Sequence, residues 1–136
     1  MYTVYAPQVT TAPTVADVLH RVNIERIEHG FAPLAYHSGL TTSAQMWAEY
    51  MRDNGIFEHG AWAERISEQY EHWRTIGENI AGGYVTAQAA VDAWMDSPGH
   101  RANILNANFD EAGVGYAVGG YYRHYYVMDY GARFKT

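Results

Sequence analysis

The chain of 136 residues contains no cysteine at all. This absence excludes a disulfide scaffold, a CxxC redox site and a cysteine-ligated zinc cluster. Lysine is almost missing as well, because Lys135 is the only one, and 9 basic side chains stand against 15 acidic ones for a net charge of −6. An acidic domain without a run of lysine or arginine binds nucleic-acid backbones poorly, so we expect no nucleic-acid partner.

Long hydrophobic runs are missing too. No stretch reaches the length of about 18 apolar residues that a membrane-spanning helix needs, so the sequence predicts no membrane span. The first residues show neither the basic nor the apolar region of a signal peptide. Residues 1–13 are polar and aperiodic and are interpreted as a leader or the remnant of a linker. Residues 14–136 then form one domain, long enough to fold on its core alone and expected to be a monomer.

Hydrophobic residues make up 48% of the chain, and they follow a helical spacing over most of it. Segments with helical spacing and start or stop signals are 14–30, 42–54, 61–70, 86–96 and 98–105. Residues 76–84 contain three glycines and predict an extended stretch or a turn. From residue 112 onward the period changes to two, and Gly119-Gly120 between two such runs predicts a β-hairpin. Helices first and strands last predict an α+β fold.

Three titratable side chains are candidates for chemistry. His59 lies in a turn, Glu78 lies between Gly77 and Asn79, and His100 lies in the first turn of the helix that begins at Pro98. The helix dipole disfavours an imidazolium there, so we expect a neutral His100 that is suited to be a ligand or a base. Separations of 19 and 22 residues do not bring the three together by themselves. A solvated loop histidine and a glutamate that bonds a nearby backbone N–H remain alternatives.

Other patterns have ordinary explanations. Ser97 and His100 are three residues apart, which allows a serine nucleophile with its base, but serine before proline is also an ordinary helix cap. The pair of His100 and Asn103 is also found in some nucleases, whose nucleic-acid substrates do not suit an acidic chain. The tyrosine-rich stretch 121–130 is able to stack bases or sugars, although aromatic residues also favour strands for packing alone.

Four motifs follow one another in the second half of the chain. They are GENIA (77–81), AVDAWM (90–95), SPGHRANIL (97–105) and GVG (113–115). Together with Phe57-Glu58-His59 upstream, they resemble the CAP superfamily of cysteine-rich secretory proteins, antigen 5 and plant pathogenesis-related proteins. The resemblance covers roughly residues 15–131 and is greatest to the short, cysteine-free prokaryotic branch. It implies a three-layer α-β-α sandwich with a central antiparallel sheet.

The resemblance also implies a cleft lined by two histidines and two acids. His59 and His100 match the histidines, Glu78 matches the first acid, and Asp96 is the acid nearest to the second position, although it is shorter and offset. Two neutral imidazoles are able to hold Zn²⁺ or another divalent cation. Glu78 would then be a ligand, or would orient one imidazole through its other nitrogen. We expect such binding to be weak rather than structural.

The leading functional hypothesis is a secreted or cell-envelope module. Its cleft at His59, Glu78 and His100 would take a divalent metal and a peptide, glycan or lipid ligand. The alternative is a hydrolase, either a protease or a cell-wall-acting enzyme, in which Glu78 is the catalytic acid or base beside the two histidines. A structural scaffold with a vestigial cleft is the third hypothesis, because one fold carries many activities.

Overall fold

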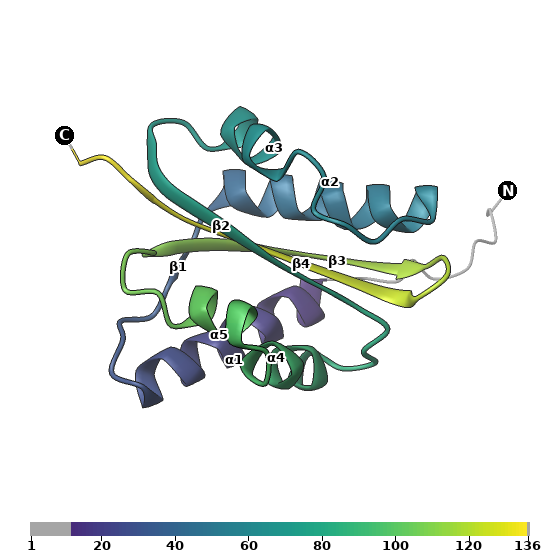
Figure 1. Ribbon diagram of the computed structural model, residues 1–136, viewed down its shortest axis with the longest axis horizontal. Helices are drawn as coiled ribbons and strands as arrows, with labels where there is room; N and C mark the ends of the chain where they lie inside the picture. The colour runs from purple at the N-terminus through teal and green to yellow at the C-terminus, as the bar shows by residue number, and fades with distance from the viewer. Residues whose placement is uncertain (1–11, 136) are drawn as a thin grey trace, which may run out of the picture.

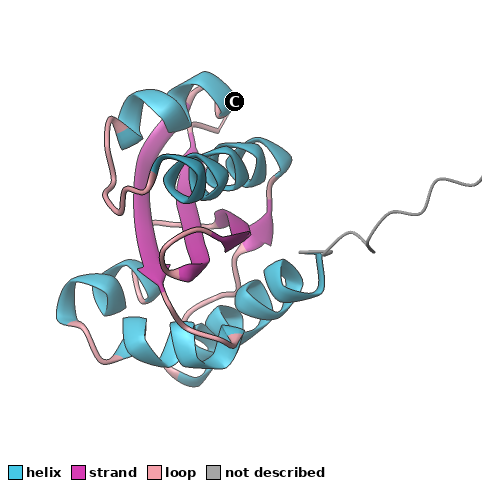
Figure 2. Cartoon of the chain, turned by 90° about the vertical axis from the view of Figure 1, so that its right-hand side faces the viewer, coloured by secondary structure: helices cyan, strands magenta, loops and turns pink. Residues whose placement is uncertain are grey.

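A sheet between two helical layers forms the body of the molecule. This computed structural model describes residues 12–135, and it places four strands between the layers (Figure 1). One layer contains α2 (Ser38–Asn54) and α3 (Trp62–Gln69), and the other contains α1 (Ala12–Glu28), α4 (Ala87–Met95) and α5 (Pro98–Ile104). The side view shows helices on both faces of the sheet (Figure 2). The predicted α-β-α sandwich is confirmed.

The sheet has the order β1-β3-β4-β2. Its strands are β1 (Ala35–Tyr36), β2 (Trp73–Gly82), β3 (Glu111–Gly119) and β4 (Arg123–Arg133). The three long strands are antiparallel, as expected, and the two-residue β1 adds a short parallel pairing to the start of β3. The predicted hairpin is present, and Gly119 and Gly120 take the positive φ angles of 117° and 69° that its turn requires.

Strand β4 is buried on both faces of the sheet. Tyr126 and Met128 face the layer of α1 and α4, whereas Tyr125 and Val127 face α2, in the two-residue alternation of a strand. Helix α2 lies directly on β3, where the backbone of Leu40 and Thr41 touches the position that a Cβ atom on Gly113 would occupy. The aromatic surplus of the sequence is therefore largely core material.

Several predicted helix ends need correction. Helix α1 begins at Ala12, two residues before the expected Thr14, and the rest of the predicted leader lies outside the described residues. Helix α2 begins four residues before position 42, because His37 Nδ1 accepts hydrogen bonds from the N–H groups of Gly39 and Leu40 and caps the helix. Ser97 precedes α5 as predicted, but its hydroxyl makes no cap bond.

The helices also bear on whether the chain crosses a membrane. Across residues 12–135, no helix combines the length and the apolar character that crossing a membrane requires. This finding agrees with the absence of a long apolar run in the sequence.

Candidate functional site

Strand β2 places Glu78 at the edge of the sheet, beside both helical layers. Glu78 lies opposite Asp129 of β4 in the antiparallel register. The carbonyl groups of Glu78 and Ile80 accept hydrogen bonds from the Asn103 and Trp94 side chains, at 3.1 and 3.0 Å. Helices α4 and α5 therefore cover the carbonyl groups of this open edge, which fixes α5 against the strand that carries Glu78.

The structure brings His59 and Glu78 together. His59 Nδ1 lies 2.8 Å from Glu78 Oε1. Arg65 of α3 donates to the same carboxylate, from Nη1 to Oε2 at 2.7 Å and from Nη2 to Oε1 at 3.2 Å. Arg65 Nη2 also donates to the His59 carbonyl at 2.9 Å. Both oxygens of Glu78 therefore have partners, and the carboxylate orients the His59 ring.

Trp47 of α2 supports this arrangement from behind. The Arg65 guanidinium lies 4.5 Å from the centre of the Trp47 ring, at a cation–π distance. The indole N–H of Trp47 donates to the Glu58 carbonyl at 2.8 Å. Gly60 turns with a φ of 59° so close to Trp47 that a Cβ atom would meet the ring at 2.8 Å. The loop that carries His59 is thus held by contacts on both sides.

A second carboxyl group, that of Asp129, lies under the first. Asp129 is fully buried, and within residues 12–135 neither of its oxygens has a hydrogen-bond partner. Arg65 Nη1 lies 3.5 Å from it. Burial and the neighbouring Glu78 raise the pKa of Asp129 well above its ordinary value. Burial also raises the pKa of Glu78, but the hydrogen bonds from His59 and Arg65 outweigh it and lower that pKa overall.

His100 enters from the opposite layer on α5. Its Nδ1 lies 2.9 Å from Ser97 Oγ, and its carbonyl accepts from Asn79 Nδ2 at 3.1 Å. Burial lowers the pKa of His100, and the nearby His59 lowers it further. Both effects favour the neutral imidazole of His100, which is the form that the sequence led us to expect.

The structure does not assemble every predicted residue. Asp96 is exposed at the end of α4, where its backbone N–H bonds the Asp92 carbonyl. In the described part of the chain, no group of three or more histidine, aspartate or glutamate side chains is arranged to hold a metal ion. The three cavities described within residues 12–135 are lined by residues other than His59, Glu78 and His100.

Sequence reasoning assigned no role to Arg65 or Asp129. A signal for Asp129 exists, since it is the one acid inside the apolar and aromatic run 125–130. The pair of Ser97 and His100 does form the contact that a serine nucleophile would need. A catalytic triad also needs an acid that orients the histidine, and Glu78 orients His59 instead.

The sequence of the chain is similar to a known protein family and to a bacterial protein. Residues 19–130 match the model of the Cysteine-rich secretory protein family, CAP. The uncharacterized protein YkwD of Bacillus subtilis (strain 168) is 39% identical over 108 residues, which cover 76% of this chain but only 42% of YkwD. The chain thus spans less than half of that relative.

Solved structures share the fold. An outer surface protein of Borrelia burgdorferi superposes with a TM-score of 0.86 at 19% identity, covering 96% of this chain and 100% of that one. An extracellular protein with an SCP domain from Bacillus anthracis superposes with a TM-score of 0.81 at 27% identity, covering 96% of this chain and 46% of that one. Extracellular proteins are therefore among the structures that this chain resembles.

Proposed function

The chain belongs to the cysteine-rich secretory protein (CAP) family, and we propose that it is a secreted or cell-envelope module that binds a divalent cation through His59 and His100. Membership supports the fold and an extracellular setting, since relatives of this fold include an extracellular protein. The cation and its ligands follow from the chemistry of the residues in the cleft.

The observation that carries the proposal is the state of the two imidazoles. His59 Nδ1 is bonded to Glu78, and His100 Nδ1 is bonded to Ser97. Within residues 12–135 no hydrogen bond engages Nε2 of either ring, so both Nε2 atoms remain free to bind a cation. Metal-binding histidines commonly bond a carboxylate through their second nitrogen, as His59 does. A neutral His100 needs no deprotonation before it binds.

Two protein ligands make an open and weak site. Glu78 fits the role of orienting His59 better than that of a direct ligand, because Arg65 and His59 already occupy its oxygens. A bound divalent cation would act as a Lewis acid with positions left for water or for an oxygen of a peptide, glycan or lipid ligand. The residues of the chain would orient the two rings and keep His100 neutral.

A hydrolase is the second candidate, supported by the Ser97–His100 contact and by the carboxylate beside His59. The pairing with Arg65 argues against it, because a carboxylate with a lowered pKa is a weak base and is not protonated to serve as an acid. The binding function is therefore favoured over turnover.

Titration with Zn²⁺ by calorimetry at neutral pH tests the proposal. We expect weak binding by the wild type and at least a tenfold loss in His59→Ala and in His100→Ala. His20→Ala removes an exposed histidine of α1 and is the matched control, which should bind as the wild type does. Equal affinity in all four proteins, or no binding by the wild type, would overturn the proposal.

A separate assay addresses the hydrolase. Wild type and Glu78→Gln are compared for turnover of casein, peptidoglycan and lipid esters. Turnover by the wild type that Glu78→Gln abolishes would replace the binding hypothesis with the enzymatic one. Unchanged turnover in the variant would exclude Glu78 as the catalytic acid or base.

A further inference from the structure

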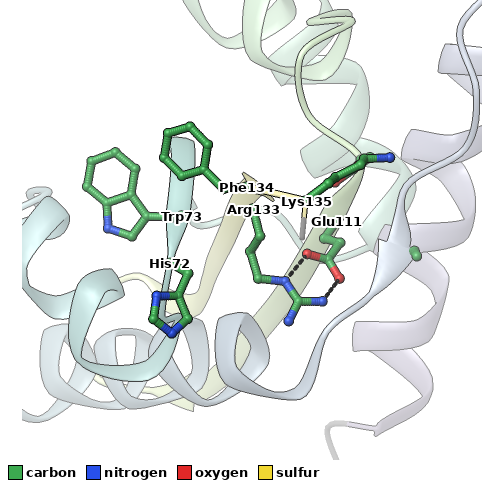
Figure 3. A pocket seen from close by; sticks show the side chains of 8 residues that line it. His72, Trp73, Glu111, Arg133, Phe134 and Lys135 are labelled. Atoms are coloured by element: carbon green, nitrogen blue, oxygen red, sulfur yellow. Dashed lines mark hydrogen bonds and ion pairs between the residues drawn. The ribbon is translucent and has the colours of Figure 1, made fainter.

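A wide cavity lies at the other end of β2 from Glu78. It is open, has a volume of about 1060 Å³, and is formed where β2 and β3 begin and β4 ends (Figure 3). Small-molecule sites have volumes of about 300–1,000 Å³, so this one has room for an extended ligand. Trp73 lies five residues before Glu78 on β2, which corresponds to about 16 Å along the strand.

Two aromatic rings line one side of this cavity. Figure 3 shows the rings of Trp73 and Phe134 on the side away from the Glu111–Arg133 pair. The Trp73 indole N–H donates to Ser67 Oγ at 2.8 Å, which fixes that ring. Phe134 leaves 65% of its surface exposed, while its backbone N–H bonds the His72 carbonyl at 3.0 Å. The Trp73 ring is thus held by a hydrogen bond, and the Phe134 ring is available to a ligand.

The opposite side carries charges of both signs. Arg133 binds Glu111 through two hydrogen bonds, Nε to Oε1 at 2.9 Å and Nη2 to Oε2 at 2.7 Å. Tyr70 donates its hydroxyl to Glu111 Oε1 at 2.6 Å. Asp110 and Lys135 add one charge of each sign to the lining. Two acids and two bases balance, so a strongly charged ligand would meet as much repulsion as attraction.

The backbone at the mouth is strained. His72, directly before Trp73, has a φ of 61°, in a region that residues other than glycine rarely adopt. Such a conformation is unfavourable and persists where the surroundings enforce it, often at ligand sites. Here it accompanies the turn that places Trp73 at the cavity.

We propose that this cavity binds a neutral oligosaccharide. A sugar ring has an apolar face of C–H groups, which would stack on Trp73 and Phe134 as other rings stack on aromatic side chains. Its hydroxyl groups both donate and accept, so they match a lining that offers carboxylate acceptors beside guanidinium and ammonium donors. The site lies apart from the His59 cleft and does not need the metal proposed there.

Binding to an array of neutral and acidic oligosaccharides tests this proposal. One arm carries N-acetylglucosamine chains, as in cell-wall backbones, and the other carries mannose- and galactose-containing chains, so the source of the glycan is distinguished. We expect the wild type to bind neutral chains in one arm. Phe134→Ala should weaken that binding by roughly tenfold, the loss typical of a removed stacking partner.

Three further variants separate the outcomes. Tyr121→Ala removes a side chain that is 83% exposed on the distant hairpin turn, and it should bind as the wild type does. Trp73→Phe keeps a ring in the partly buried position, so it should retain folding and most of the binding. His59→Ala should leave glycan binding unchanged even if it abolishes binding of Zn²⁺. Absence of binding to every neutral chain, or equal binding by Phe134→Ala and wild type, overturns the proposal.

Discussion

Replacement of Arg26 by methionine should destabilise the fold strongly, although Arg26 lies on a surface-facing helix far from the cleft in sequence. The side chain is only 2% exposed. Its guanidinium donates to four backbone carbonyls: Ala32 at 2.8 Å, Ile104 at 2.8 Å, Asn106 at 3.0 Å and Phe109 at 3.1 Å. One side chain of α1 thereby holds the end of α5 and the loop that leads into β3.

The magnitude follows from two opposing effects. Hydrogen bonds to a charged group contribute about 1.5–3 kcal/mol each, and buried carbonyls left without a donor cost about 1–3 kcal/mol each. Burial of the guanidinium opposes this gain, and it lowers the pKa of Arg26. Because four carbonyls lose a donor while the cost of burying the guanidinium is relieved, we expect a net loss of about 3–5 kcal/mol for Arg26→Met. That is a large fraction of the roughly 5–15 kcal/mol that stabilises a domain.

Urea unfolding followed by tryptophan fluorescence measures the effect. A loss of this size should lower the unfolding midpoint by about 2 M. Arg26→Lys keeps the charge but not the planar fork, so it should fall between methionine and the wild type. The matched control is Arg21→Met on the same helix, where a half-exposed pair with Asp17 contributes less than about 1 kcal/mol. An Arg26→Met variant within about 1 kcal/mol of the wild type would refute the reasoning.

Two further substitutions test burial and close packing. Asp129→Asn removes a carboxyl group whose pKa in the folded protein is raised above its ordinary value of 3.8. Because the unfolded wild type loses this proton more readily than the folded protein does, the stability of the wild type falls as the pH rises above that value. The free energy of unfolding of the variant relative to the wild type, measured with urea, should increase as the pH rises from about 4 to neutrality. A decrease of this difference over the same pH range would contradict the prediction. Gly113→Ala places a Cβ atom against the backbone of α2 and should lose several kcal/mol, about 3 or more. Gly99→Ala meets no atom within 4 Å and should change stability by less than about 1 kcal/mol, so equal melting temperatures of the two would exclude the packing argument.

Local sequence patterns predicted most of the fold because their causes are local. Apolar spacing indicated α1, α2 and α4, and the Ser97-Pro98 pair indicated α5. Gly55, with a φ of 63°, ends α2 where Asn54-Gly55 predicted. The start of α2 was missed, since histidine is an uncommon cap and the bonds of His37 depend on the turn around it. Strand β2 begins three residues before the predicted stretch 76–84 and ends two residues before the end of that stretch, because its pairing with β4, far along the chain, defines its bounds.

The residues of the candidate site were likewise predicted only in part. The motifs predicted His59, Glu78 and His100, and the structure gives His59 and Glu78 a direct contact. Arg65 and Asp129 escaped prediction because their contacts with Glu78 join α3 and β4 to β2, and no local pattern encodes such pairings. Whether the cleft takes a metal stays a prediction that the zinc titration decides.

The two residues that the sequence did not reveal bear most directly on function. With both carboxyl groups ionised, Arg65 would leave a net negative charge in a buried cluster, which agrees with the raised pKa of Asp129. Glu78 then keeps its charge, paired with Arg65, and donates nothing. Such a carboxylate orients the His59 ring through Nδ1 and is poorly suited to act as a general acid or base. These contacts therefore fit the proposed cation binding by His59 and His100 better than acid–base turnover at Glu78.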